Sequence, residues 1–332
     1  MINKFEKKVL DTIRKFNMIT PGDNIIACVS GGADSMALLN SLLNLKNLTK
    51  YNELIVCHVN HMLRKEAEEE TKFVKDFCED NNIRCFVKYV DINAIAKENK
   101  IGLEEAGRIE RYKFFDEIAK KEGFNKIAVA HNKKDNSETV LMHLLRGSGL
   151  NGLTGIHPVR DNFIRPIIKC TREEIEEYLK EENIEFKVDK TNSENDYTRN
   201  KIRNELIPYL EKEYNENIVD SLDRLSEIAS EEQEFIKSEI ERNYSKCLKK
   251  ANETSIELDL KKFNLNHRFI RKQIAIHTIT SLLGNSTNIA KVNIDDIVEL
   301  AENNVGNKNL FPNKNIKVYI KSGIIYFYKL TN

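Results

Sequence analysis

The sequence predicts an α/β fold, a doubly wound parallel sheet followed by a mainly helical C-terminal domain. Short apolar runs alternate with longer amphipathic runs over the first half of the 332 residues, as in parallel sheets covered by helices on both faces. The short runs are nearly continuous in hydrophobic residues, which is typical of strands buried on both faces. After about residue 171 helical patterns dominate, and this change predicts a second domain.

The predicted elements follow one another regularly along the chain. The N-terminal residues predict an amphipathic helix, and Thr171 with Glu174 three residues later matches a capping box that begins another helix. The last residues alternate as a hairpin with Ser322 and Gly323 at its turn. A boundary near residues 211–216 divides the chain into expected domains 1–213 and 214–332. Strands are predicted at 24–29, 53–59, 84–90 and 126–130, and helices at 35–45, 66–80, 103–121 and 136–145.

Composition favours a cytoplasmic protein with no membrane partner. Hydrophobic residues make up 40% of the chain and charged residues 31%, and the net charge is zero. No apolar run approaches the roughly 18 residues of a membrane span, and charges interrupt every apolar stretch of the N-terminus, so no signal peptide is expected. The six cysteines form no CxxC pair, which argues against a zinc ribbon or a thioredoxin-type site.

Charge is uneven along the chain. Residues 241–275 hold nine Lys/Arg and four acids, and a basic patch of this kind suits an RNA contact. A solvated surface is the alternative interpretation. The candidates for RNA binding here are Lys249, Lys250, Lys261 and Lys262.

The segment SGGADS, residues 30–35, stands between the first predicted strand and the helix that follows it. Gly31 and Gly32 let the backbone approach a ligand, and the helix N-terminus favours an anion. Asp34 suits phosphate only if Mg²⁺ lies between them. The segment lacks the lysine of a Walker A loop, and a tight turn is the alternative. We expect it to bind nucleotide phosphates through Ser30, Gly31, Gly32, Ala33, Asp34 and Ser35.

SGGxDS after the first strand resembles the signature of the PP-loop ATP pyrophosphatases. Four further stretches, 57–64, 105–115, 131–155 and 189–209, resemble the tRNA(Ile)-lysidine synthetase family, and the resemblance spans residues 20–210. It implies a C–N ligase that uses ATP and Mg²⁺. Carbon 2 of the wobble cytidine in a CAU-anticodon tRNA(Ile) is adenylated with release of pyrophosphate, and the ε-amino group of L-lysine displaces AMP to form lysidine.

The resemblance assigns roles to individual residues. Asp135 and Glu138, three apart at a predicted helix start, share one side of the helix and are expected to bind lysine together with Arg203. Asp135 as an N-cap with Glu138 as its box partner is the alternative. The expected catalytic residues are Asp34, which also holds Mg²⁺, His131 for proton transfer, Asp135, and Arg146, which otherwise serves as a cation at a helix C-terminus.

The remaining predicted contacts belong to ATP and tRNA. His58, Asn60 and His61 follow the second strand and are expected to line the nucleotide pocket. Arg108 is assigned to ATP, and Arg111 and Arg199 to tRNA, although surface arginines are often only solvated. A homodimer is the arrangement that related enzymes suggest. Longer members of the family carry a further C-terminal domain, so a short member or a piece of a longer protein is expected.

Two other functions compete with this interpretation. A tRNA thiolase of the same superfamily would use the same adenylate but attack it with sulfur, and such enzymes commonly need a CxxC motif and an iron–sulfur cluster. A non-catalytic RNA-binding module would keep the fold and the basic patch without the chemistry. The intact SGGADS segment and the Asp135, Glu138 and Arg146 set argue against such decay.

Overall fold

The computed structural model describes residues 2–62, 66–187, 198–284, 291–304 and 308–330. The chain forms two compact units, Met1–Ala229 and Ser230–Asn332. The division falls inside the long helix α12 (Ile218–Cys247), later in the chain than the expected boundary at residue 213. Most of the polar stretch at 189–200, and residues 63 and 64 of the motif at 57–64, lie outside the described residues.

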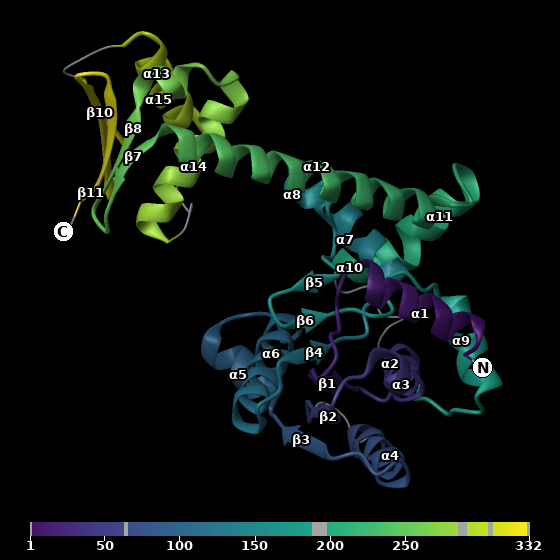
Figure 1. The fold of residues 1–332 in the computed structure, drawn as a ribbon. Helices are drawn as coiled ribbons and strands as arrows, with labels where there is room; N and C mark the ends of the chain where they lie inside the picture. Colours follow the sequence, from purple (N-terminus) through teal and green to yellow (C-terminus); the bar gives the residue numbers. More distant parts are fainter. Residues whose placement is uncertain (1, 63–65, 188–197, 285–290, 305–307, 331–332) are drawn as a thin grey trace. The chain divides into compact units, whose positions relative to one another are not determined.

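The first unit is built on a six-stranded sheet in the order β3-β2-β1-β4-β6-β5 (Figure 1). Neighbouring strands are parallel except for β5, which runs antiparallel to β6. The strand order reverses beside β1, and ligands of open α/β sheets bind at this switch point. The doubly wound parallel sheet predicted from the sequence is therefore confirmed. The strands are β1 (Asn24–Cys28), β2 (Glu53–Asn60), β3 (Cys85–Tyr89), β4 (Lys126–Ala128), β5 (Val159–Arg160) and β6 (Phe163–Ile164).

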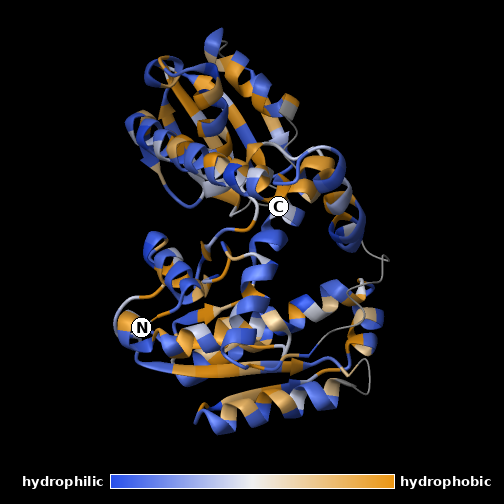
Figure 2. Ribbon diagram, turned by 90° about the vertical axis from the view of Figure 1, so that its right-hand side faces the viewer, coloured by the Kyte–Doolittle hydropathy of each residue, from blue (hydrophilic) through white to orange (hydrophobic). Residues whose placement is uncertain are grey.

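Helices cover both faces of this sheet. Successive residues of a strand pack against opposite layers because their side chains point to opposite sides. Ile25 of β1 packs with α1, α2 and α9, whereas Ile26 packs with Phe114 and Phe115 of α6. The strands are hydrophobic and the helices carry mixed surfaces (Figure 2). The helices are α1 (Lys4–Lys15), α2 (Ala33–Asn44), α3 (Lys46–Thr49), α4 (Glu66–Asp80), α5 (Ile92–Asn99), α6 (Leu103–Glu122), α7 (Lys133–Leu145), α8 (Leu150–Leu153), α9 (Arg172–Glu181), α10 (Thr198–Lys201) and α11 (Ile207–Glu213).

The capping box predicted at Thr171 is confirmed. The amide of Glu174 donates to Thr171 Oγ1 at 3.3 Å, and the amide of Thr171 donates to Glu174 Oε2 at 2.9 Å. A single π-helical turn, Ile202–Leu206, joins α10 to α11. Such turns are rare and occur often at functional sites.

The second unit contains a five-stranded antiparallel sheet in the order β7-β8-β11-β10-β9. The predicted hairpin is confirmed as β10 (Ile316–Lys321) and β11 (Ile324–Lys329), with Ser322 and Gly323 at φ 50° and 73° in its turn. The sequence did not predict β7 (Leu248–Ala251), β8 (Ser255–Asp259) and β9 (Asn309–Asn313). The helices of this unit are α13 (Leu260–Asn264), α14 (Arg268–Leu283) and α15 (Lys291–Glu302). Within the described ranges, no helix has the length and apolar character needed to cross a membrane.

Candidate functional site

A cleft of about 520 Å³ opens where β1, β2 and β4 end. This volume lies in the range of small-molecule sites. Its walls are the loop after β1, the end of β2, one side of α6 and the loop between β4 and α7. The polar side chains that line it include Ser30, Asp34, Ser35, His58, His61, Arg108, Arg111, His131, Arg172, Lys187 and Arg199. The switch point therefore holds a pocket rich in both charge and hydrogen-bond donors.

The loop after β1 closes on the hydroxyl of Ser35. Ser35 Oγ accepts from the amides of Ser30 at 3.1 Å and Gly31 at 3.2 Å, and donates to the carbonyl of Gly32 at 2.8 Å. Gly31 lies at φ +91°, and a Cβ there would meet Val74 Cγ2 at 3.4 Å. The backbone conformation thus favours glycine at this position.

An anion at this loop would meet the start of α2. The first helical hydrogen bond runs from the amide of Met36 to the carbonyl of Gly32, so the amides of Ala33, Asp34 and Ser35 precede it and have no partner within the helix. These amides and the helix dipole favour negative charge. The amides of Ser30 and Gly31, which the sequence interpretation also offered to phosphate, are engaged by Ser35 instead.

Asp34 lies between two partners that sequence reasoning missed. Its Oδ1 accepts from Asn132 Nδ2 at 3.1 Å, and its Oδ2 accepts from Arg172 at 3.2 Å. Burial raises the pKa of Asp34, and the guanidinium of Arg172 opposes that rise. The side chain is 31% exposed, so a carboxylate oxygen can still face the cleft. Mg²⁺ commonly uses one carboxylate together with substrate phosphates, and Asp34 fits that role.

Asp135 and Glu138 meet two arginines in a compact cluster. Arg199 donates to Asp135 Oδ1 at 3.0 Å and Glu138 Oε2 at 2.8 Å. Arg203 donates to Asp135 Oδ1 at 2.8 Å and to the two oxygens of Glu138 at 2.5 and 3.0 Å. Glu138 is fully buried, and the two arginine side chains are each 30% exposed. Arg199 lies on α10 and Arg203 on the π-helical turn that follows it, and both guanidiniums reach the same two carboxylates.

The start of α7 differs from the capping alternative in both of its residues. Asn132 is the N-cap, and Asp135 is its box partner, since the amide of Asn132 donates to Asp135 Oδ2 at 2.9 Å. Asp135 therefore caps the helix with one oxygen and contacts the arginines with the other. Glu138 as the box partner is wrong, because it lies one turn too far along the helix.

Comparisons with known proteins show the family to which this chain belongs. Residues 1–210 match the model of the PP-loop domain family. The tRNA(Ile)-lysidine synthase of Clostridium tetani is 39% identical over 324 residues, which cover 96% of this chain and 68% of that protein. The chain belongs to the tRNA(Ile)-lysidine synthase family.

Two further comparisons set the extent of the match. The tRNA(Ile)-lysidine synthase of Clostridium perfringens is 43% identical over 307 residues, covering 91% of this chain and 64% of that protein. The chain thus spans about two thirds of the length of the tRNA(Ile)-lysidine synthases it matches. The U34-tRNA thiolase NcsA from Methanococcus maripaludis, solved with its [4Fe-4S] cluster, is 19% identical with a TM-score of 0.53, covering 67% of this chain and 79% of that one. That likeness shows a shared fold.

His131 of this family member is held by a buried arginine. Arg165 Nε donates to His131 Nδ1 at 3.1 Å, and the same guanidinium donates to the carbonyl of His157 at 2.7 Å. Burial lowers the pKa of His131 to about 4, and Asp135 opposes that shift. At neutral pH the imidazole is uncharged, with Nδ1 accepting and the proton on Nε2. Arg165 was missed, and the only signal was an arginine inside the apolar run FIRPII.

His58 and Asn60 of the second strand have structural partners. His58 Nδ1 donates to the carbonyl of Val29 at 2.9 Å, and its Nε2 forms a hydrogen bond with Thr71 Oγ1 at 3.0 Å. His58 also lines the cleft. Asn60 donates to the carbonyl of Ala67 and to Thr71, and it is buried between β2 and α4. A nucleotide role for Asn60 stays a prediction, since its amide ties the strand end to the helix.

The arginines of the sequence prediction separate into two groups. Arg108, Arg111 and Arg199 all line the cleft, so the pair assigned to tRNA lies beside the nucleotide loop. Arg146 is exposed at the C-cap of α7, eleven residues after Asp135, which is about 16 Å along the helix. The structure of this unit does not bring Arg146 to the cleft, and its catalytic role stays a prediction.

The basic candidates of the second unit are solvent-exposed. Lys249, Lys250, Lys261 and Lys262 are all exposed. Asp259 accepts a hydrogen bond from the backbone amide of Lys262 at 3.0 Å and forms an ion pair with Lys249 Nζ at 3.4 Å. This links the end of β8 to the start of α13 and places two of the four lysines around one carboxylate.

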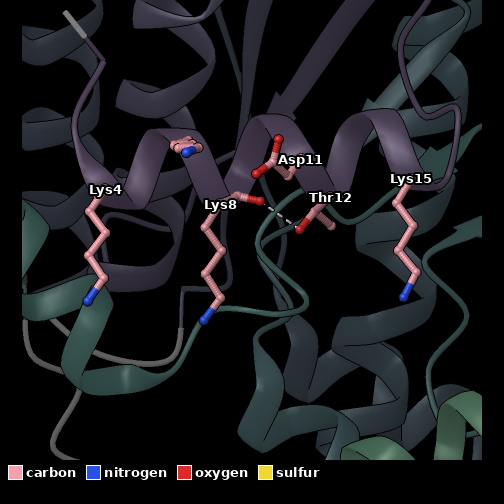
Figure 3. A pocket seen from close by; sticks show the side chains of 6 residues that line it. Lys4, Lys8, Asp11, Thr12 and Lys15 are labelled. Atoms are coloured by element: carbon pink, nitrogen blue, oxygen red, sulfur yellow. Dashed lines mark hydrogen bonds between the residues drawn. The ribbon is translucent and has the colours of Figure 1, made fainter.

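A second hollow, of about 300 Å³, lies along α1 (Figure 3). Two of the lysines that line it form ion pairs. Lys8 contacts Glu174 at 2.6 Å, and Lys15 contacts Glu227 at 2.8 Å. These contacts tie α1 to α9 and α12 and offer no catalytic group. The hollow is lined by Lys4, Lys7, Lys8, Asp11, Thr12 and Lys15.

Proposed function

We propose that this chain ligates L-lysine to carbon 2 of the wobble cytidine of a CAU-anticodon tRNA(Ile), using ATP and passing through an adenylated tRNA. One observation carries the proposal. Asn132 donates to Asp34 through its side chain and to Asp135 through its amide, at 3.1 and 2.9 Å. The phosphate loop and the carboxylates suited to a cationic amine therefore share one residue, as expected if adenylation and amine attack occur at the same place.

The adenylation half uses the loop and α2. The cytidine O2 attacks the α-phosphate of ATP, the bond to the β-phosphate breaks, and pyrophosphate leaves. The amides of Ala33, Asp34 and Ser35 and the dipole of α2 suit that leaving group. Arg108 and Arg111, which line the cleft, supply positive charge for the remaining phosphate. Mg²⁺ held by Asp34 would neutralise charge on the phosphates.

The second half uses the arginine–carboxylate cluster. Asp135 and Glu138 suit the ammonium groups of lysine, and the guanidiniums of Arg199 and Arg203 suit its carboxylate by bidentate bonds. The ε-amine attacks carbon 2, the C–O bond to AMP breaks, and the amine loses a proton. His131 Nδ1 is occupied by Arg165, so in this arrangement His131 offers a hydrogen-bond donor at Nε2.

A sulfur-transfer function is less well supported. Cys28 and Cys57 line the cleft, but burial raises the pKa of Cys57 to about 12 and that of Cys28 well above its usual value. A nucleophilic thiol needs a lowered pKa. Within the described part of the chain, no group of three or more His, Cys, Asp or Glu side chains is placed to hold a metal ion.

Nucleoside analysis tests the proposal directly. A CAU-anticodon tRNA(Ile) transcript incubated with the chain, ATP, Mg²⁺ and L-lysine should yield lysidine with matching amounts of AMP and pyrophosphate. A transcript with guanosine at the wobble position is the control. RNA binding without AMP would favour the non-catalytic module and contradict the proposal. A homodimer and a cytoplasmic location belong to the same proposal, and sedimentation of the purified chain tests the first.

A further inference from the structure

The sheet of the second unit has two unlike faces. Helices α14 and α15 contact its strands and lie on one side of it (Figure 1). Because side chains alternate along a strand, every second residue of β10 and β11 points to the other side. Cross-strand pairing sets Tyr319 opposite Tyr326 and Lys317 opposite Tyr328. The buried alternates that pack toward the helices are Val318, Ile320, Ile325 and Phe327.

The three tyrosine rings are nearly parallel. Tyr319 lies 4.8 Å from Tyr326 with 14° between the planes, and 5.9 Å from Tyr328 with 2°. Tyr326 and Tyr328 lie 6.2 Å apart at 17°. All three are only partly buried, and Phe311 of the neighbouring β9 is 59% exposed. Cross-strand aromatic pairs stabilise a sheet, but stability alone does not require rings that stay open to solvent.

Lysines accompany the rings. Lys317 Nζ lies 5.2 Å from the Tyr319 ring centre, and Lys321 follows at the next position on the same face of β10. On the other side of β11 from β10, Tyr326 pairs with Glu257 of β8, and Glu257 pairs with Lys250 of β7. We call the face formed by Tyr319, Tyr326, Tyr328, Lys317 and Lys321 the tyrosine face.

We propose that the tyrosine face binds unpaired nucleotides of an RNA. Bases stack on parallel aromatic rings in a sequence-tolerant way, and neighbouring lysines attract the phosphates. A duplex keeps its bases stacked inside the helix, so it would use the lysines but not the rings. This inference rests on the proposed function only in that the substrate is an RNA, and it names the unpaired part of that RNA as the ligand.

Fluorescence anisotropy of the full chain tests this, with a labelled 12-nucleotide single-stranded RNA and the same RNA annealed to its complement. No ATP or lysine is added, so the result is independent of lysidine formation. Tyr319→Leu, Tyr326→Leu and Tyr328→Leu should each weaken binding of the single strand about five-fold or more and leave the duplex nearly unchanged. Tyr326→Phe should stay within about two-fold. Phe269→Leu on α14, where the ring is 42% exposed, is the matched control and should have no effect.

The proposal would be overturned if leucine variants that melt cooperatively bound the single strand as tightly as the unmodified chain does. It would also be overturned if the variants lost equal affinity for the single strand and the duplex. Should the variants unfold, the unmodified chain decides. Photo-crosslinking with 5-iodouridine RNA should modify a peptide within 316–329. Crosslinks confined to residues 1–229 would overturn the proposal. Self-association through this face, seen as a dimer in sedimentation that Tyr326→Leu dissociates, would also overturn it.

Discussion

Glu138→Gln should destabilise the first unit although it changes a single atom. Glu138 is fully buried, and its two oxygens accept three guanidinium N–H bonds at 2.5, 2.8 and 3.0 Å. A bond to a charged group contributes about 1.5–3 kcal/mol and a neutral one about 0.5–1.5, and the amide NH₂ of glutamine would face a donor. Losing about 1 kcal/mol at each bond gives roughly 3 kcal/mol. Because the arginines are each 30% exposed, water reduces this to about 2–3 kcal/mol.

Hydrogen exchange measured by mass spectrometry suits this test, because a chain of two units need not unfold in one step. Peptides from α7 report the free energy of opening around residue 138. A loss of 2–3 kcal/mol corresponds to exchange about 30–150 times faster. Glu53→Gln is the matched control. It breaks a pair with Arg84 at 2.9 Å in which both side chains are about half exposed, and should change stability by less than about 0.5 kcal/mol.

An unchanged exchange rate in Glu138→Gln would refute this reasoning. It would mean that the guanidiniums keep full solvation in solution and that the carboxylate is not their main partner. A loss equal to that of Glu53→Gln would lead to the same conclusion. A double variant with Arg203→Met then measures the coupling directly, and we expect a coupling energy well above the surface-pair range.

Three further predictions concern the cleft. Asp34→Asn should reduce pyrophosphate release about 100-fold or more, because it removes the carboxylate proposed to hold Mg²⁺ beside the phosphates, and near-normal release would contradict the role. Gly31→Ala should cost about 1–2 kcal/mol and abolish release, whereas Gly22→Ala, at φ +90° against +91°, should cost a similar amount and keep it. The lowered pKa of His131, about 4 against 6.5, means that the unfolded chain binds the proton first as pH falls. The free energy of unfolding should therefore drop between pH 6.5 and 4 by up to about 1.4 kcal/mol per pH unit from this group. In His131→Gln, the free energy of unfolding measured by urea melts should fall less steeply with pH over this range.

Much of the first unit could be predicted because its strands obey one rule. Ile25 and Ile26 are both apolar since they pack on opposite faces, so the buried strands are visible as continuous runs. The start of α7 was placed three residues late. Asn132 followed by Asp135 is a capping box built from an amide and an aspartate, which is less conspicuous than the usual Ser/Thr and Glu pair.

The missed parts depend on contacts that no local pattern encodes. Arg172 reaches Asp34 across 138 positions of the chain, and Arg199 reaches Glu138 across 61. In sequence these arginines are ordinary first-turn or surface residues. The strands β7 and β9 were missed for another reason, because LKKA and NLFPN are short and mostly polar or interrupted by proline. They gain their pairing from β8 and β10 rather than from their own propensity.

The neutrality of the arginine–carboxylate cluster bears on the kind of ligand that the cluster could bind under the proposed function. Asp135 and Glu138 carry two negative charges, and Arg199 and Arg203 carry two positive ones. A ligand with only amines would draw the carboxylates away and leave the partly buried guanidiniums unpaired, which is costly. An amino acid brings its own carboxylate, so each guanidinium and each carboxylate can exchange one partner for another of the same charge. Under the proposed function, the cluster would therefore favour a zwitterion with an additional amine over a simple diamine, as expected if lysine is the nucleophile.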